Sequence, residues 1–183
     1  MEEVKKHHMM LDLETLGKTS DSVILSIGAV CFDMDGTIGP EFEVYPKVEP
    51  QIPNRKIEWS AICWWMKQEE AARNAIVDPE RTLTLSQCLE KLTFFCKSNL
   101  DEKFKVWSNG AAFDIATMNH AYDQLRMEKP WSYKHELDTR TMVYMSRIST
   151  KNYEATGIKH RAVDDCKWQI SWLVDAFKIL RGY

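Results

Sequence analysis

An apolar run near the N-terminus leads directly into two carboxylates, and this stretch constrains the fold more than any other. Met9-Met10-Leu11 is followed by Asp12-Leu13-Glu14 and then by Thr, Leu and Gly. Side chains alternate between the two faces of a β-strand, so we expect Asp12 and Glu14 on one face and Leu13 in the core. Two carboxylates at the end of a buried strand repel each other unless a cation lies between them, and Mg²⁺ or Mn²⁺ prefers such oxygen ligands. A lone pair of this kind is more often a solvated strand end, so its meaning depends on residues later in the chain.

The size and composition of the chain fit a single domain. With 183 residues, 44% of them hydrophobic, the chain can bury a sizeable core. We therefore expect residues 1–183 to form one domain, with residues 1–7 as a flexible tail. The net charge of −3 predicts no large basic surface for duplex DNA. A contact with nucleic acid would then be short and local, with metal ions neutralising the phosphate charge.

The cysteines are odd in number and scattered, without a C-x-x-C pair: Cys31, Cys63, Cys88, Cys96 and Cys166. They lie in apolar or helical contexts, which predicts buried free thiols in a reducing cytoplasm. The charged N-terminus lacks the long apolar segment of a signal peptide, and no stretch approaches the roughly 18 consecutive apolar residues of a membrane span. The composition therefore favours a cytoplasmic protein that does not contact a membrane.

Apolar patterning predicts three strands followed by alternating helices and strands. The first strands are expected at residues 8–13, 23–32 and 38–45, with a hairpin turn at Asp35-Gly36. Ser60 is expected to cap a helix, and Thr84 with Gln87 matches a capping box. The later elements are a strand at 104–107, a helix from Asp114, a short strand near 135–139, a helix to about Ser146 and a last helix from Ala162 to Leu180. This order predicts the α/β class, with a mixed sheet flanked by helices.

Three later residues can join Asp12 and Glu14 in one site. Asp114 follows a strand and a turn and opens a helix, His160 precedes the last helix, and Asp165 lies near the start of that helix. Taken singly, each has a structural explanation: His160 as an exposed loop residue, and Asp165 as a charge that complements the helix dipole. Their ordered combination is what indicates a site.

The order of these motifs along the chain resembles that of a known protein family. A D-x-E pair on a first strand, an Asp after a strand and turn, and the late block His160-Arg161-Ala162-Val163-Asp164-Asp165 together resemble the DEDDh branch of the DnaQ-like 3′–5′ exonucleases. The resemblance spans the chain from Asp12 to Asp165. It implies a ribonuclease-H-like mixed sheet, an antiparallel three-strand meander plus parallel strands, and hydrolysis of 3′ ends to 5′-mononucleotides.

The resemblance also implies a set of site residues. Two divalent ions, Mg²⁺ or Mn²⁺, would be held about 4 Å apart by Asp12, Glu14, Asp114 and Asp165. These ions would acidify the attacking water and stabilise the leaving 3′ oxygen, and His160 would be the general base. The family spacing from His160 selects Asp165 as the last ligand. Its neighbour Asp164 is then expected to be a solvent-facing charge.

The same resemblance suggests how the substrate is held. It places the 3′ end near Thr15 and Leu16, with Leu16 wedged against a base. Phe113 could press on the terminal nucleotide. One of Trp64 and Trp65 could stack on a base, and we take Trp65 as the candidate, although a structural role for both is equally open. The expected substrate is a single-stranded 3′ end or overhang of RNA or DNA, and no residue distinguishes the two.

The tandem tryptophans, the compact size and the block Leu137-Asp138-Thr139-Arg140-Thr141 make the chain similar to the small bacterial and phage branch of these exonucleases. That branch includes exoribonucleases and exodeoxyribonucleases. Asp138 and Arg140 could orient groups around the site, but a helix N-cap and its ion pair are the stronger explanation. Related small exonucleases are often dimers, so a homodimer remains open.

Two alternative functions compete with this interpretation. Asp33-Met34-Asp35-Gly36-Thr37 matches the D-x-D-G-T motif of haloacid-dehalogenase-like phosphatases, and Ser108-Asn109-Gly110 and Asp164-Asp165 resemble later motifs of that family. That family requires a helix after the first motif, whereas residues 38–45 alternate like a strand, so we interpret Asp33 and Asp35 as hairpin residues. The second alternative is a non-catalytic nucleic-acid-binding module on the same fold. Such a module would have no use for a full set of mutually repelling carboxylates.

Overall fold

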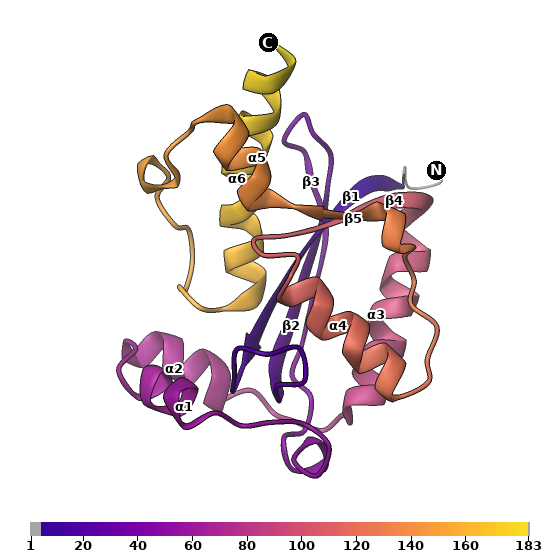
Figure 1. Ribbon diagram of the computed structural model, residues 1–183, viewed down its shortest axis with the longest axis vertical. Helices are drawn as coiled ribbons and strands as arrows, with labels where there is room; N and C mark the ends of the chain where they lie inside the picture. Colours follow the sequence, from indigo (N-terminus) through magenta and orange to yellow (C-terminus); the bar gives the residue numbers. More distant parts are fainter. Residues whose placement is uncertain (1–4, 183) are drawn as a thin grey trace.

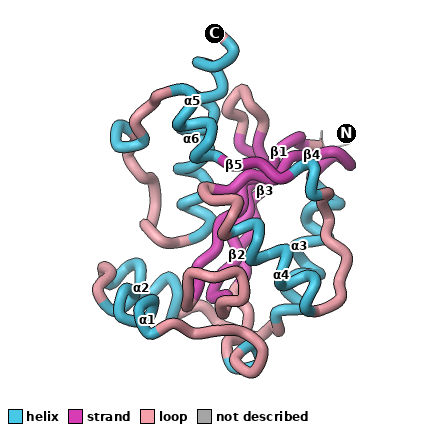
Figure 2. The backbone as a smooth tube through the Cα atoms, viewed as in Figure 1, coloured by secondary structure: helices cyan, strands magenta, loops and turns pink. Residues whose placement is uncertain are grey.

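The computed structural model describes residues 5–182, and a five-stranded mixed sheet forms its centre (Figure 1 and Figure 2). The strands lie in the order β3-β2-β1-β4-β5. The antiparallel meander consists of β1 (Lys6–Thr15), β2 (Ile24–Phe32) and β3 (Ile38–Val44), and the parallel strands are β4 (Leu100–Ser108) and β5 (Glu136–Asp138). The predicted α/β class and the meander followed by parallel strands are confirmed.

Helices cover both faces of this sheet (Figure 1). One face is covered by α3 (Leu85–Asn99) and α4 (Asp114–Gln124), and the other by α5 (Thr139–Ser146) and α6 (Ala162–Arg181). The short helices α1 (Trp59–Met66) and α2 (Glu70–Val77) lie beside the end of β1. None of the helices in residues 5–182 has both the length and the apolar character needed to cross a lipid bilayer.

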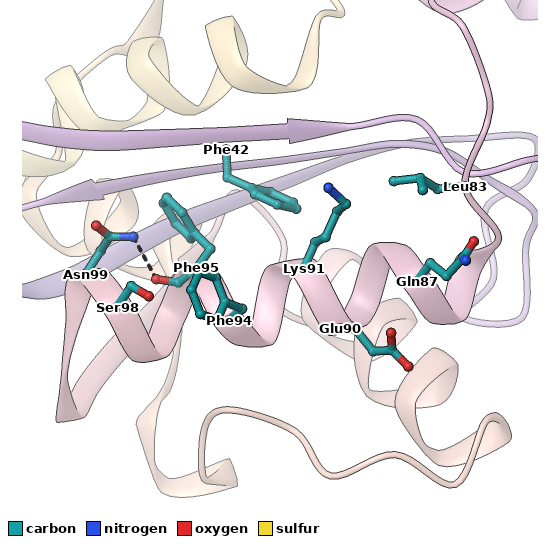
Figure 3. Close-up of a pocket in the computed structure, with 9 residues that line it drawn as sticks. All are labelled: Phe42, Leu83, Gln87, Glu90, Lys91, Phe94, Phe95, Ser98 and Asn99. Carbon is teal, nitrogen blue, oxygen red and sulfur yellow. Dashed lines mark hydrogen bonds between the residues drawn. The ribbon is translucent and has the colours of Figure 1, made fainter.

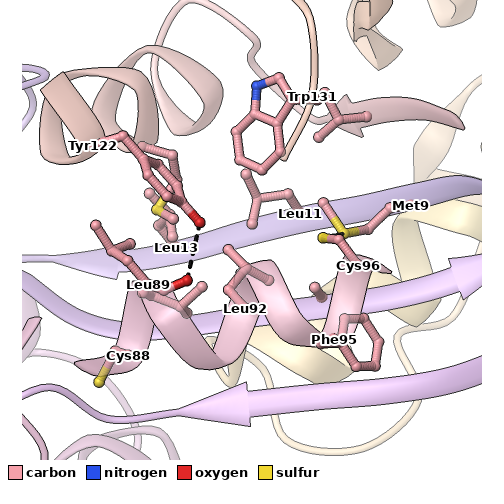
Figure 4. Packing of buried hydrophobic residues seen from close by; sticks show 14 of the residues in the cluster. Met9, Leu11, Leu13, Cys88, Leu89, Leu92, Phe95, Cys96, Tyr122 and Trp131 are labelled. Carbon is pink, nitrogen blue, oxygen red and sulfur yellow. Dashed lines mark hydrogen bonds between the residues drawn. The ribbon is translucent and has the colours of Figure 1, made fainter. Parts of the chain in front are cut away.

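The side chains of β1 alternate as the sequence predicts. Leu11 and Leu13 belong to the core between the sheet and α3 (Figure 4), whereas Met10 belongs to the core beneath α6. Because alternate residues of a strand share a face, Asp12 and Glu14 lie on the side of Met10. The end of β1 therefore directs both carboxylates toward α6.

Several predictions of element boundaries need correction. The expected tail is wrong at residues 6 and 7, since β1 begins at Lys6, while residues 1–4 lie outside the described part of the chain. Ser60 does not cap α1, because that helix begins at Trp59 after Glu58. β4 begins at Leu100, earlier than expected.

Other local predictions hold. Thr84 and Gln87 form the predicted capping box, with the Gln87 N–H donating to the Thr84 hydroxyl at 3.4 Å and the Thr84 N–H donating to Gln87 Oε1 at 2.9 Å. Gly36 has a φ of 97° in the turn between β2 and β3, as expected of a hairpin glycine. Four of the cysteines are buried free thiols, whereas Cys63 is only half-buried.

Gly28 allows the start of α6 to approach the sheet closely. It lies opposite Asp12 in the antiparallel register of β1 and β2. A Cβ at this position would come within 2.5 Å of the Ala162 carbonyl carbon and 2.6 Å of the Val163 nitrogen. Backbone atoms cannot rotate away as a side chain can. The missing side chain of Gly28 therefore permits the first turn of α6 to lie next to Asp12.

We expect Gly28→Ala to destabilise the protein, because its Cβ must push α6 away from the sheet. Overpacking of this kind costs about 1–3 kcal/mol of unfolding free energy. Urea denaturation followed by circular dichroism measures the loss. Gly39→Ala in β3 is the matched control, since its nearest neighbour atoms belong to the flexible Lys6 side chain. Equal losses in the two variants would contradict this account of Gly28.

Candidate active site

Three elements bring four carboxylates together. Asp12 and Glu14 come from the end of β1, Asp114 is the first residue of α4, and Asp165 lies in the first turn of α6. The backbone of Leu13, between the two β1 carboxylates, lies close enough to the Asp114 carboxylate to lower its pKa. Asp114 and Asp165 both raise the pKa of Asp12, so their charges lie near it. The structure thus assembles the four predicted residues at one place.

Burial makes this group of carboxylates electrostatically costly. Asp12, Glu14 and Asp114 are 7–9% exposed. Burial, reinforced by the neighbouring carboxylates, raises the pKa of Asp12 and Glu14 well above the usual range. Burial also raises the pKa of Asp114 to about 7 and that of Asp165 to about 6.

Little within the protein offsets this negative charge. In residues 5–182, no lysine or arginine forms an ion pair with Asp12, Glu14, Asp114 or Asp165. Asp12 Oδ1 accepts a hydrogen bond from Gln169 Nε2 at 2.7 Å. A set of oxygen donors with uncompensated negative charge is the environment that a hard divalent cation requires. The donor set therefore fits Mg²⁺ or Mn²⁺.

His160 lies beside the same carboxylates. Ligand atoms of Glu14, His160 and Asp165 lie within 4.8 Å of one another, and His160 Nδ1 is 3.9 Å from Asp165 Oδ2. The His160 N–H donates to the same Asp165 oxygen at 3.2 Å. Burial, with a smaller contribution from Lys159, lowers the pKa of His160 below its usual value. The neutral imidazole is thereby favoured.

A cavity of about 580 Å³ opens beside Glu14, large enough for a small ligand. Of the residues predicted to bind substrate, Thr15, Phe113 and Trp65 line it. Leu16 does not line it. The Leu16 side chain packs against the small apolar cluster of Leu25, Trp65 and Ile76, so its predicted contact with a base has no support from this placement.

The two adjacent tryptophans have different surroundings. Trp65 is buried, and its indole N–H donates to the Thr15 carbonyl oxygen at 3.0 Å, so it fixes the end of β1. Trp64 is 42% exposed and places its ring edge-on to His160, with the ring centroids 4.8 Å apart. Trp64, rather than Trp65, therefore has the exposed ring face near the catalytic candidates.

The block around Asp138 supports the turn that leads to Asp114. Asp138 is the N-cap of α5, as the structural explanation predicts, and accepts the Thr141 N–H at 2.8 Å. Its other oxygen accepts the Ala111 N–H at 2.9 Å. The Arg140 guanidinium lies against Gly110 and also lines the cavity. Asp138 thus caps a helix and holds the turn before α4.

Two further features of the molecule, the phosphatase-like motif and a second groove, are separate from this site. Asp33 forms an ion pair with Lys6 at 2.8 Å, and Asp35 accepts the Thr37 N–H at 2.8 Å, so both belong to the hairpin and the phosphatase alternative is not favoured. A separate groove of about 610 Å³ on α3, lined partly by Phe42 and Phe94, contains none of the predicted site residues (Figure 3).

The sequence interpretation missed several contributors to the site. Gln169 follows Asp165 by one helical turn, so its place on the same face of α6 is visible in the sequence. Lys18 and Arg140 line the cavity. No motif marks Lys18, and for Arg140 the sequence favoured a structural role beside the Asp138 helix cap. The prediction for Asp164 is wrong, because this carboxylate is buried rather than solvent-facing.

We expect stability without divalent ions to fall as the pH rises. Asp114 titrates near 3.8 in an unfolded chain and near 7 when folded, so the folded protein binds this proton more tightly. The resulting stability is complete below the unfolded pKa and is lost as the pH rises through the folded pKa. Thermal melting as a function of pH in the presence of a chelator measures this loss of stability. As the pH increases, the melting temperature of Asp114→Asn should rise progressively above that of the wild type. Added Mg²⁺ should restore the stability of the wild type above pH 7. Asp33→Asn serves as the control. A wild-type melting temperature that rises with pH relative to Asp114→Asn would contradict the expectation.

Comparisons with known proteins agree with this geometry. A family model for the 3′–5′ exoribonuclease Rv2179c-like domain matches residues 7–177. Comparison with curated protein sequences finds no match. The fold is similar to that of the nuclease domain of 3′hExo, described as a DEDDh family member bound to rAMP, with a TM-score of 0.63 and 14% identity over 100% of this chain and 96% of that chain.

Two exonuclease I structures share the fold. The enzyme from Methylocaldum szegediense has a TM-score of 0.67 at 13% identity over 96% of this chain, and the zinc-bound E. coli ExoI–ssDNA complex has a TM-score of 0.62 at 14% identity over 98% of this chain. The chain spans only 42% and 41% of their lengths. These likenesses confirm the ribonuclease-H-like fold. Because the family model covers most of the sequence, the chain belongs to the 3′–5′ exoribonuclease Rv2179c-like family, a group of hydrolytic 3′–5′ exonucleases.

Proposed function

We propose that this 3′–5′ exonuclease removes 5′-mononucleotides from single-stranded RNA by a two-metal-ion mechanism. The observation that carries the proposal is the convergence of three buried carboxylates, the half-buried Asp165 and His160 beside one open cavity. RNA is proposed because the matching family model describes an exoribonuclease domain. Exonuclease I, described in complex with single-stranded DNA, has the same fold, so the preference for RNA over DNA rests on the family rather than on the fold.

Asp12, Glu14, Asp114 and Asp165 are proposed to bind two Mg²⁺ or Mn²⁺ ions. When bound, these ions would supply positive charge that acidifies the attacking water and stabilises the leaving 3′ oxygen. The carboxylates come from rigid elements, which supports a fixed geometry for the donor oxygens. Gln169, through its hydrogen bond to Asp12, holds one of them in orientation.

His160 is proposed to take the proton from the attacking water. Its imidazole lies next to Glu14 and Asp165, within reach of a water held by the same carboxylates. Its lowered pKa keeps the ring neutral and able to accept a proton near pH 7. A positioned general base contributes typically about 10²–10⁴-fold to the rate.

The cavity walls suggest how the terminal nucleotide is held. Phe113 and Trp64 offer aromatic surface for a base, and Thr15 also lines the cavity. Arg140 and Lys18 are the cations of the lining, and neither forms an ion pair within the described residues. We propose that Arg140 contacts a backbone phosphate of the substrate. We also propose a cytoplasmic location from the free buried thiols, and a homodimer from the resemblance to small exonucleases.

We expect Asp12→Ala and Asp165→Ala to abolish degradation of a 5′-labelled oligonucleotide in Mg²⁺ or Mn²⁺, because each removes a metal ligand. His160→Ala should lower kcat by about 10²-fold or more and leave metal binding largely intact. Asp33→Asn is the matched control, because the hairpin carboxylate should leave nuclease activity unchanged. Near-wild-type activity in Asp12→Ala would contradict the assignment, and so would release of inorganic phosphate from small phosphomonoesters that is lost in Asp33→Asn.

We expect faster digestion of single-stranded RNA than of DNA of the same sequence. A side-by-side digest of single-stranded and 3′-overhang oligonucleotides, with products separated by size and identified by mass, measures both preferences. DNA degraded faster than RNA would overturn the proposed substrate but leave the nuclease assignment in place.

Arg140→Gln should raise KM for single-stranded RNA about tenfold at low salt, because a charged hydrogen bond to phosphate is worth about 1.5–3 kcal/mol. The salt dependence of log KM should also become shallower by about 0.7, the slope for one phosphate contact on a single strand. Steady-state kinetics across ionic strength measure both quantities. Arg147→Gln, at the other end of α5, is the control. A loss of kcat without a change in the salt slope would show that Arg140 does not act on phosphate.

A further inference from the structure

The segment that carries His160 has an unusual backbone conformation. Gly157 has a φ of 85° and His160 a φ of 64°, both in the left-handed region. Glycine adopts this region readily, but a histidine there is uncommon and persists where its surroundings hold it. Residues 154–159 are exposed, so the restraint must come from contacts with α6 and its neighbours.

Asp164 makes the contact that restrains this segment. Its carboxylate is buried, and Oδ2 accepts the Ile158 N–H at 3.0 Å. Asp164 also pairs with Lys167 at 3.2 Å and with Arg161 at 3.7 Å. These partners neutralise the charge and hold the carboxylate against the backbone two residues before His160.

The backbone of Gly157 also packs closely against the Asp164 carboxylate. A Cβ at this position would lie 2.5 Å from the Asp164 carboxyl carbon and 2.6 and 2.9 Å from its oxygens. The backbone of Gly157 therefore approaches Asp164 as closely as a residue without a side chain allows. The positive φ and the close approach both require glycine here.

The segment is also fixed after His160. The His160 N–H donates to Asp165 Oδ2 at 3.2 Å, and Arg161 binds Glu43 of β3 at 2.7 Å. The backbone on both sides of His160 is thus tied to acidic side chains, with Asp164 holding the preceding residues. Asp164 does not line the active-site cavity. Its closest contacts toward the site are with the segment that carries His160.

We propose that Asp164 is a positioning residue for His160, whose carboxylate sets the 157–160 backbone so that the imidazole faces Glu14 and Asp165. This inference rests on the proposed role of His160 as general base. It assigns to the first Asp of the Asp164-Asp165 pair a role distinct from that of the second: Asp165 offers an oxygen to the site, and Asp164 orients the base.

Kinetics of single substitutions provide the first test. Asp164→Ala should lower kcat about tenfold or more, because misplacing a reacting group by about 1 Å can cost 10²-fold, while KM changes little. Asp164→Asn retains an oxygen that can accept the Ile158 N–H and should recover most of kcat. Asp175→Ala is the matched control on the same helix, since its carboxylate bonds to Tyr153 and does not contact residues 157–160. Wild-type kcat in Asp164→Ala would overturn the proposal.

A double-mutant cycle distinguishes positioning from a general structural role. In the His160→Ala background, Asp164→Ala should cause no further loss of kcat, because the group it orients is gone. If the kcat losses of the two single substitutions multiply in the double mutant, the proposal is overturned, although His160 remains the base. Wild-type kcat in His160→Ala alone would instead refute the general-base assignment, and this inference with it. If Asp164→Ala does not fold, Gly157→Ala displaces the same contact without removing the carboxylate, and the same cycle and outcomes apply.

Discussion

Repulsion among four carboxylates, three of them buried, is the interaction on which the rest of the site depends. Such a group is unfavourable in the folded protein, so rigid elements must hold it in place. The end of β1 supplies two of the carboxylates, and the starts of α4 and α6 supply one each. Gly28 lets α6 approach the sheet beside Asp12, and the backbone of Leu13 lies close to the Asp114 carboxylate. The charge that remains uncompensated is what makes the site suited to divalent cations.

The proposed general base is held in a different way. The carboxylates lie on a strand and two helices, whereas His160 lies on the segment before α6 with a left-handed backbone. Contacts with Asp164 and Asp165 replace the rigidity that secondary structure gives the other residues. The position of the proposed base therefore depends on side-chain contacts, one of them with the proposed ligand Asp165.

The D-x-D-G-T sequence shows how tertiary context decides the role of a motif. Asp33 and Asp35 match a phosphatase motif better than Asp12 and Glu14 match anything by themselves. Asp33 pairs with Lys6 on the neighbouring strand, and Asp35 accepts the Thr37 N–H in the turn, so both carboxylates belong to the hairpin. The alternation after Gly36, visible in the sequence, was sufficient to reject the motif, because a strand there leaves no room for the required helix.

The sequence by itself determined the α/β class and the facing of Asp12 and Glu14, because strand alternation is a local property. The five residues of the proposed catalytic set came from the resemblance of the ordered motifs to a known family. The sequence did not determine which tryptophan is exposed, that Leu16 packs away from the cavity, or that Arg140 lines it. Asp164 is the clearest case: next to a carboxylate in a helix start, it has the pattern of a solvated charge. Asp164 is buried because Gly157 and Ile158 pack against it at the start of α6. Contacts between a loop and a helix are set by tertiary packing, which no local sequence pattern encodes.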